Sequence, residues 1–152
     1  MRAFLAVAAA AVVVLAFRAA PASQAPVPAW GPAPPVFPAG ARMAVMQGDP
    51  SQTALFTVRL EMPDGYTIAS HFHPTDEHIT VISGTFLVGM GDAVDTPHAI
   101  TLAPGGFITA GATMHHWAVA KGKTVVQVHA MGPFSLTYVN PKDDPQNKAR
   151  TR

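Results

Sequence analysis

Residues 65–84 of the 152-residue chain read GYTIASHFHPTDEHITVISG. Two histidines, His71 and His73, are separated by one residue, so in a β-strand both imidazoles point to the same face. Residues 74–76 form a turn that can bring the carboxylate of Glu77 back toward the imidazoles. Two imidazoles fill an apolar core poorly because each needs hydrogen-bonding partners, but together they form half of a metal site. The alternative interpretation is a surface His-x-His pair beside a solvated glutamate.

The sequence on either side predicts an all-β domain. Thr53 to Met62 alternates apolar and polar residues, which is typical of a half-buried strand. We expect a hairpin at Ser83-Gly84 between the strands Glu77–Ile82 and Thr85–Met90. Further short runs between Gly and Pro turns predict the strands Tyr66–His73, Ala99–Leu102, Phe107–Ala110, His116–Ala120, Thr124–Ala130 and Phe134–Val139. About nine short strands in about 100 residues indicate a sandwich or a small barrel.

The glycines around the histidine cluster complete a longer pattern. From Gly65 to Gly84, the spacing of glycine, His71, His73, Glu77 and glycine resembles the first conserved motif of the cupin superfamily. Residues 73–78, 83–86 and 126–134 also resemble a group of small exported bacterial cupins, and the resemblance covers about residues 29 to 145. It implies a single-domain cupin jelly-roll β-barrel, the type-2 conserved barrel.

The second cupin motif is only partly present. Counted from Gly105, its histidine falls at His116, while Gly111 and Thr113 replace its Pro and Gly, and Ala120 replaces its final Asn. This departure leaves His115 as a rival to His116. Adjacent residues face opposite sides of a strand, so only one of the two can point at a metal.

The resemblance implies one divalent metal ion bound by His71, His73, Glu77 and His116. Fe, Mn, Zn, Ni and Cu are not distinguished by these ligands. The chain has no cysteine, so thiolate ligands and thiol catalysis are excluded. Three neutral imidazoles and one carboxylate give a divalent ion a net charge of +1 and leave coordination positions open for water or substrate.

Three further side chains are candidates to line the cavity. Gln127 and His129 share one face of a strand, and they either line the cavity or form an outward polar face. Tyr138 is the third candidate, with packing in the barrel as its alternative. His78 is next to Glu77, so we expect it to face away from the metal.

Residues 1–22 have the layout of a secretory signal peptide. Met1-Arg2 is basic, Ala3 to Phe17 is apolar, and Ala20-x-Ala22 is a cleavage signal, with Ser23-x-Ala25 as second choice. The alternative is a membrane anchor, although the apolar run is shorter than a span of about 20 residues. We expect cleavage, no stable membrane insertion afterwards, and a periplasmic or secreted protein.

The remaining chain divides by composition. Residues 23–40 belong to a Pro-rich linker or strap, residues 41–140 to the barrel, and residues 141–152 to a polar tail. Without the signal, eight basic and nine acidic residues give a net charge of −1. No basic cluster remains to follow a phosphate backbone, so we expect no nucleic-acid partner.

These features favour a metal-dependent enzyme that acts on a small molecule, with dioxygenase-type oxygenation as the leading reaction. One alternative is a binding or sensing protein that uses the metal to hold an anionic ligand. Another is a barrel with a purely structural metal. Small cupins often dimerise through barrel edges, so a homodimer is a further expectation.

Overall fold

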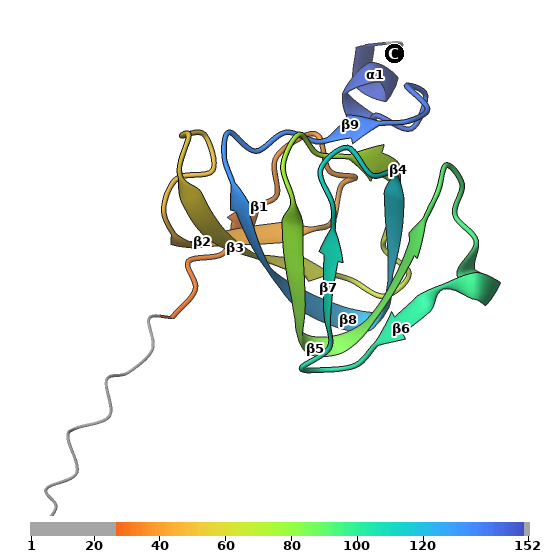
Figure 1. Cartoon of the computed structure of the whole chain (residues 1–152), viewed down its shortest axis with the longest axis horizontal. Coiled ribbons are helices and arrows are strands. Elements are labelled where there is room, and N and C mark those ends of the chain that lie inside the picture. Colours follow the sequence, from red (N-terminus) through yellow and green to blue (C-terminus); the bar gives the residue numbers. More distant parts are fainter. Residues whose placement is uncertain (1–26, 151–152) are drawn as a thin grey trace, which may run out of the picture.

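The computed structural model describes residues 27–150, in which nine strands form one sheet that curls into a barrel (Figure 1). The strands are β1 (Gly31–Pro32), β2 (Arg42–Gln47), β3 (Leu55–Met62), β4 (Thr67–Phe72), β5 (Glu77–Met90), β6 (Ile100–Leu102), β7 (Phe107–Ala110), β8 (His116–Met131) and β9 (Thr137–Tyr138). Two short helices are η1 (Thr96–His98) and α1 (Pro145–Arg150). The all-β jelly-roll prediction is confirmed. The expected signal segment, residues 1–22, lies outside the described residues.

Strand β8 organises the barrel because it pairs along both of its edges. Its first half pairs with β4 and its second half with β3 on one edge, while β5 follows its other edge along nearly the whole length. One layer therefore contains β1, β2, β3, the end of β8, the start of β5, and β7. The other layer contains β9, β4, the start of β8, the end of β5, and β6.

The two long strands pass from one layer to the other at a bulge. The β5–β8 register shifts between Val81 and Thr85, where Gly84 has a φ of +79°. A Cβ on Gly84 would lie 2.5 Å from the carbonyl oxygen of Lys123, so only glycine fits here. Thr124, which is fully buried, fixes the bend because its hydroxyl contacts both the amide and the carbonyl of Thr85.

The hairpin predicted at Ser83-Gly84 is wrong. The chain continues through Gly84 as the single strand β5, and it likewise continues through Lys121-Gly122 as β8. A glycine with positive φ suits a bulge as well as a turn, and here the continuous partner strand decides for the bulge.

The alternation predicted for Thr53 to Met62 is confirmed in β3. Apart from the exposed Leu55, its apolar side chains point into the barrel, where Phe56 and Met62 are fully buried. They form one core with the inward residues of β5 and β8, including Val81, Val88 and Val126.

Part of the expected strap belongs to the barrel. Within residues 27–40, β1 pairs with β2, and Phe37 lies in the hydrophobic core. The hydroxyls of Tyr66 and Tyr138 donate hydrogen bonds to the carbonyls of Pro38 and Val36. The sheet therefore begins inside this segment rather than at residue 41.

The expected polar tail contains helix α1, which Figure 1 shows beyond β9 at one end of the barrel. Between residues 27 and 150, no helix has the length and apolar character needed to cross a membrane.

Candidate metal centre

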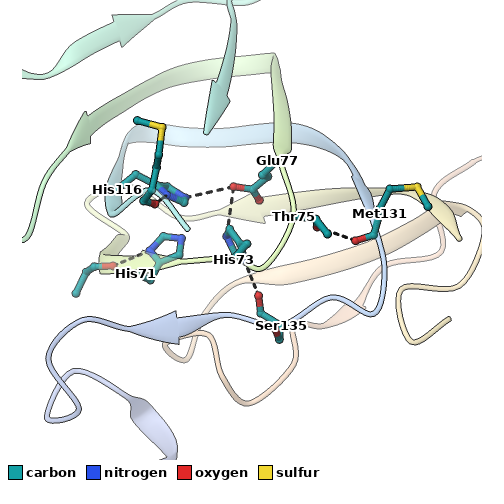
Figure 2. A network of polar contacts seen from close by, with 9 residues as sticks. His71, His73, Thr75, Glu77, His116, Met131 and Ser135 are labelled. Atoms are coloured by element: carbon teal, nitrogen blue, oxygen red, sulfur yellow. Dashed lines mark hydrogen bonds and ion pairs between the residues drawn. The ribbon is translucent and has the colours of Figure 1, made fainter. Parts of the chain in front are cut away.

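Four ionisable side chains meet inside the barrel (Figure 2). His71 lies in β4 and pairs directly with His116, the first residue of β8. His73 follows the end of β4, and Glu77 is the first residue of β5. All four are buried, and one potential ligand atom from each lies within 4.8 Å of the others.

Glu77 reaches the histidines by a different route from the one expected. The sequence suggested a tight hairpin between the strands that carry His73 and Glu77. In the described residues, β4 and β5 do not pair with each other, and each pairs with a different edge of β8. Strand β8 therefore sets the separation of the two strands, and it supplies His116 as well.

Backbone carbonyls fix the orientation of all three imidazoles. The Nδ1 atoms of His71, His73 and His116 lie 2.7, 2.7 and 3.0 Å from the carbonyl oxygens of Ala69, Ser135 and Met114. A carbonyl oxygen only accepts, so each Nδ1 carries the proton and donates it. In the neutral ring, each Nε2 is then left with a free lone pair, which is the form that binds a metal.

The free nitrogens face a carboxylate. Nε2 of His73 and Nε2 of His116 each lie 3.4 Å from Oε2 of Glu77. Both nitrogens are buried and have no hydrogen-bond partner. Imidazole lone pairs and a carboxylate repel each other unless a cation lies between them. The donor set therefore fits a divalent metal ion, because a single ion would satisfy all of these atoms.

The pKa values show how the cluster behaves without a metal. Burial, together with the imidazoles of His116 and His73, lowers the pKa of His71 to about 3, so this ring stays neutral. Burial alone would lower the pKa of His73, but the nearby Glu77 outweighs it and raises the pKa. Burial alone would raise the pKa of Glu77, but His116 and His73 outweigh it and hold the pKa below its usual range. Without a metal, the cluster therefore favours a positive charge beside the carboxylate of Glu77.

The structure brings His116, and not His115, to this cluster. His115 is partly exposed, stacks on Phe72 at a ring-centroid distance of 5.4 Å, and places Nδ1 2.6 Å from Oδ1 of Asp92. The two neighbours face opposite sides of the strand, as alternation requires. His78 also points away from the cluster, and its Nδ1 lies 3.0 Å from the hydroxyl of Thr109.

The three candidates for cavity lining lie elsewhere. Gln127 and His129 contact each other and, in turn, Arg59 and Thr57 of β3. They lie on the outward face, because the alternate residues Val126 and Val128 line the cavity instead. Tyr138 packs in the core, with its ring 6.2 Å from that of His71 and its hydroxyl on the strap.

The cavity around the cluster is narrow and apolar. Its free volume is about 30 Å³, room for a metal ion and one or two small ligands. Apart from the cluster itself, the described lining residues are all apolar: Phe37, Met43, Val58, Leu60, Ile68, Ile79, Phe86, Val88, Ala118, Val126, Val128, Phe134 and Leu136. This lining keeps the site at low polarity, which strengthens any electrostatic interaction within it.

Sequence reasoning missed the segment that supports His73. Phe134 stacks on the His73 ring at 5.1 Å, and the next residue, Ser135, provides the carbonyl that orients the ring. Any residue can offer a carbonyl, so its identity carries no signal. The available signal was the Gly132-Pro133 turn, which ends the long strand near an aromatic residue.

Comparison with known proteins identifies the fold. No family model matches the sequence. No curated protein sequence matches it either. Among solved structures, a polyketide cyclase from Streptomyces resistomycificus is similar, with 17% identity, a TM-score of 0.58, and coverage of 72% of this chain and 78% of that one.

Two further solved structures have a similar fold. A cupin superfamily protein from Desulfitobacterium hafniense has 13% identity and a TM-score of 0.52, covering 60% of this chain and 77% of that one. An oxalate oxidase has 19% identity and a TM-score of 0.51, covering 64% of this chain and 55% of that one. The chain therefore has the cupin fold, as the first motif predicted.

Proposed function

We propose that this chain is a metal-dependent enzyme that acts on a small molecule, with one divalent ion bound by His71, His73, Glu77 and His116. One observation carries the proposal. Three imidazoles, each held by a backbone carbonyl at Nδ1, turn bare Nε2 atoms toward a buried carboxylate. Burying three imidazoles and a carboxylate together costs free energy unless a cation lies among them. A role in packing alone therefore does not explain this cluster.

A bound ion would supply Lewis-acid or redox chemistry at coordination positions that the protein leaves free. The protein's own residues hold the ligand geometry, exclude water through the apolar lining, and keep His71 neutral. Glu77 contributes the negative charge that leaves the loaded site at +1, which favours an anionic or oxygen-donor ligand.

Oxygenation is the favoured reaction class. Hydrolysis and isomerisation usually need a positioned acid or base besides the metal ligands, and the described lining offers only apolar side chains apart from the cluster. A site of imidazoles and a carboxylate with open positions suits Fe(II). One structure of the same fold is an oxalate oxidase, which supports redox chemistry as a use of this barrel.

A binding or sensing role is the second candidate. The observation that favours it is the size of the cavity, since about 30 Å³ leaves little room for a substrate beside the metal. In this alternative, the loaded site holds a small anion and performs no reaction.

Metal analysis of the purified protein tests the site. We expect close to one divalent ion per chain, and loss of that ion in His73→Ala and His116→Ala with the far-ultraviolet circular dichroism retained. His115→Ala is the matched control and should keep full occupancy, because His115 points away from the cluster. Full occupancy in His116→Ala, or loss in His115→Ala, would contradict the assignment.

Oxygen consumption separates the two functions. The iron-loaded protein should consume O₂ in a screen of small organic acids and phenols, while His73→Ala should not. A protein that holds only zinc and shows no turnover would exclude the oxygenase and leave the binding role.

We also propose that the chain is exported, with residues 23–152 as the mature protein. The support is the sequence of residues 1–22 alone. Mass spectrometry of protein recovered from the periplasm or medium should give a chain that starts at Ser23. An intact chain in the membrane fraction would favour the anchor. Sedimentation of the same sample tests the expected homodimer.

A further inference from the structure

The metal cavity can be reached from outside at few points. Of the residues that line it, only Met43 and Phe134 are half-buried, and the others are buried. Met43 lies in β2, beside its partner Gly31 in β1. Phe134 lies between β8 and β9, outside any strand. At one of these two points, the barrier between the cluster and the exterior is therefore the Phe134 side chain.

Aromatic rings hold Phe134 in place. Its ring stacks on His73 at 5.1 Å and on Phe37 of the strap at 6.3 Å, and it meets Phe56 edge-on at 5.6 Å. One face of this ring touches a proposed metal ligand. Movement of the ring would therefore open a path that ends at His73.

A surface pocket lies on the other side of this barrier. It has a volume of about 410 Å³, within the range of small-molecule sites, and it shares Phe134 and Leu136 with the metal cavity. Its remaining apolar walls are Pro34, Val36 and Pro50, and its polar walls are neutral: Ser51, Ser135 and Gln146. We call this pocket the vestibule.

We propose that the vestibule binds the apolar body of the substrate and that Phe134 is the gate between it and the metal centre. The inference rests on the proposed function. No charged side chain lines the vestibule within the described residues, so a charged group gains nothing there. The loaded centre, at +1, favours an anionic oxygen. The substrate class is therefore a small monoanionic oxygen acid with an apolar body.

The geometry also explains how a cavity of about 30 Å³ could serve a larger substrate. Only the anionic head needs to enter the metal cavity, and the body stays in the vestibule. Ser135 lines the vestibule, and its carbonyl oxygen orients the ring of His73 in the metal cavity. This residue therefore links the two spaces.

The test uses the full chain loaded with Co²⁺, whose visible absorption reports ligand exchange at the metal. Benzoate has a carboxylate and an apolar ring, and formate has the carboxylate alone. We expect benzoate to bind at least about tenfold more tightly than formate, because the vestibule removes the ring from water. Equal affinities for benzoate and formate would overturn the proposal.

Substitutions test whether the ring of benzoate lies in the vestibule. Ser51→Trp fills the vestibule from an exposed turn and should weaken benzoate binding about tenfold while changing formate binding less than about twofold. Gln146→Trp, on another wall, should act in the same way if Ser51→Trp does not fold. Thr101→Trp on β6 adds the same ring outside both pockets and should change neither affinity. Unchanged benzoate affinity in a folded vestibule variant would overturn the proposal.

Two measurements distinguish this inference from the proposed function. In metal-free protein, benzoate should shift the amide NMR signals of Ser51 and Leu136 but not that of Thr101, and shifts elsewhere would overturn the vestibule. Phe134→Ala should raise the association rate of benzoate with the Co²⁺ protein, and an unchanged rate would overturn the gate. A chain that takes up no Co²⁺ refutes the proposed function, whereas one that binds Co²⁺ without preferring benzoate refutes only this inference.

Discussion

Gly89 leaves room for a neighbouring ring. It pairs with Trp117 across β5 and β8, and a Cβ at this position would lie 2.2 Å from Cζ2 of the indole. Trp117 is only 1% exposed, so the ring has little freedom to move aside. Trp117 follows His116 directly in the chain. The packing of this ring therefore helps to set the direction of a proposed ligand.

We expect Gly89→Ala to destabilise the protein by about 1–3 kcal/mol, because overpacking forces the ring or the backbone to shift. Urea denaturation followed by tryptophan fluorescence measures the change. Gly31→Ala is the matched control, since a Cβ there meets nothing within 4 Å. Its effect should stay within about 0.5 kcal/mol. Equal midpoints for the two variants would contradict the steric explanation.

His71 makes the stability of the metal-free protein depend on pH. Its pKa falls from 6.5 to about 3 on folding, so between these values the unfolded chain binds a proton that the folded chain does not. Stability should therefore decrease as the pH falls, by about 1 kcal/mol per pH unit. The raised pKa of His73 acts in the opposite direction and above pH 6.5, and the lowered pKa of Glu77 adds to the loss only below 4.5.

Urea denaturation with a chelator at pH 6.5 and pH 5 isolates the His71 contribution. The wild-type chain should lose stability across this window, and His71→Gln should lose less, because glutamine does not titrate. Parallel losses in both proteins would assign the acid sensitivity to another group.

At the scale of elements, the bulge that bends β5 and β8 depends on Thr124. Its hydroxyl accepts a hydrogen bond from the amide of Thr85 at 3.2 Å and lies 3.0 Å from the Thr85 carbonyl. Valine has nearly the same shape and lacks the hydroxyl. Without it, the Thr85 amide at the bend loses a partner inside the protein.

We expect Thr124→Val to lower the free energy of unfolding by about 1–3 kcal/mol, the cost of an unsatisfied buried polar group. Thr101→Val is the control, because Thr101 is exposed on β6, and it should change stability by less than about 0.5 kcal/mol. Thermal denaturation of both variants measures the difference. A Thr124→Val protein as stable as wild type would show that water or the backbone replaces the hydroxyl.

The bend also shows where sequence reasoning reached its limit. The cluster of His71, His73 and Glu77 was predictable because its spacing is local and its residue types are specific. The course of the chain at Gly84 was not, since a positive φ suits both a hairpin and a bulge, and a distant strand decides between them. The choice of His116 needed the motif frame, and the carbonyl of Ser135 left no trace in the sequence.

On the scale of the whole molecule, the segment before residue 41 is part of the folded unit. Phe37 is 7% exposed in the core and stacks on Phe134, and β1 extends the sheet. The compositional boundary between strap and barrel therefore differs from the physical one. Proline content indicated a linker or a strap, and Phe37 anchors this segment in the core as a strap.

A chain that begins at residue 27 should fold like the mature protein. One that begins at residue 41 loses Phe37 and β1 and should be less stable by about 3–5 kcal/mol, the cost of removing a large buried ring. Phe37→Ala in the longer chain should reproduce most of this loss. Thermal denaturation compares the three chains. Equal melting temperatures would show that the strap only rests on the barrel.

Because β8 pairs with β3, β4 and β5, none of these strands can complete its main ladder until residues 116–131 are available. Pairs such as Leu55 with Met131 close long loops, which makes folding slow. During synthesis, the first three-quarters of the polypeptide therefore lacks the strand on which the barrel closes. Closure of the barrel and completion of the candidate ligand set by His116 therefore both wait for the last quarter of the chain.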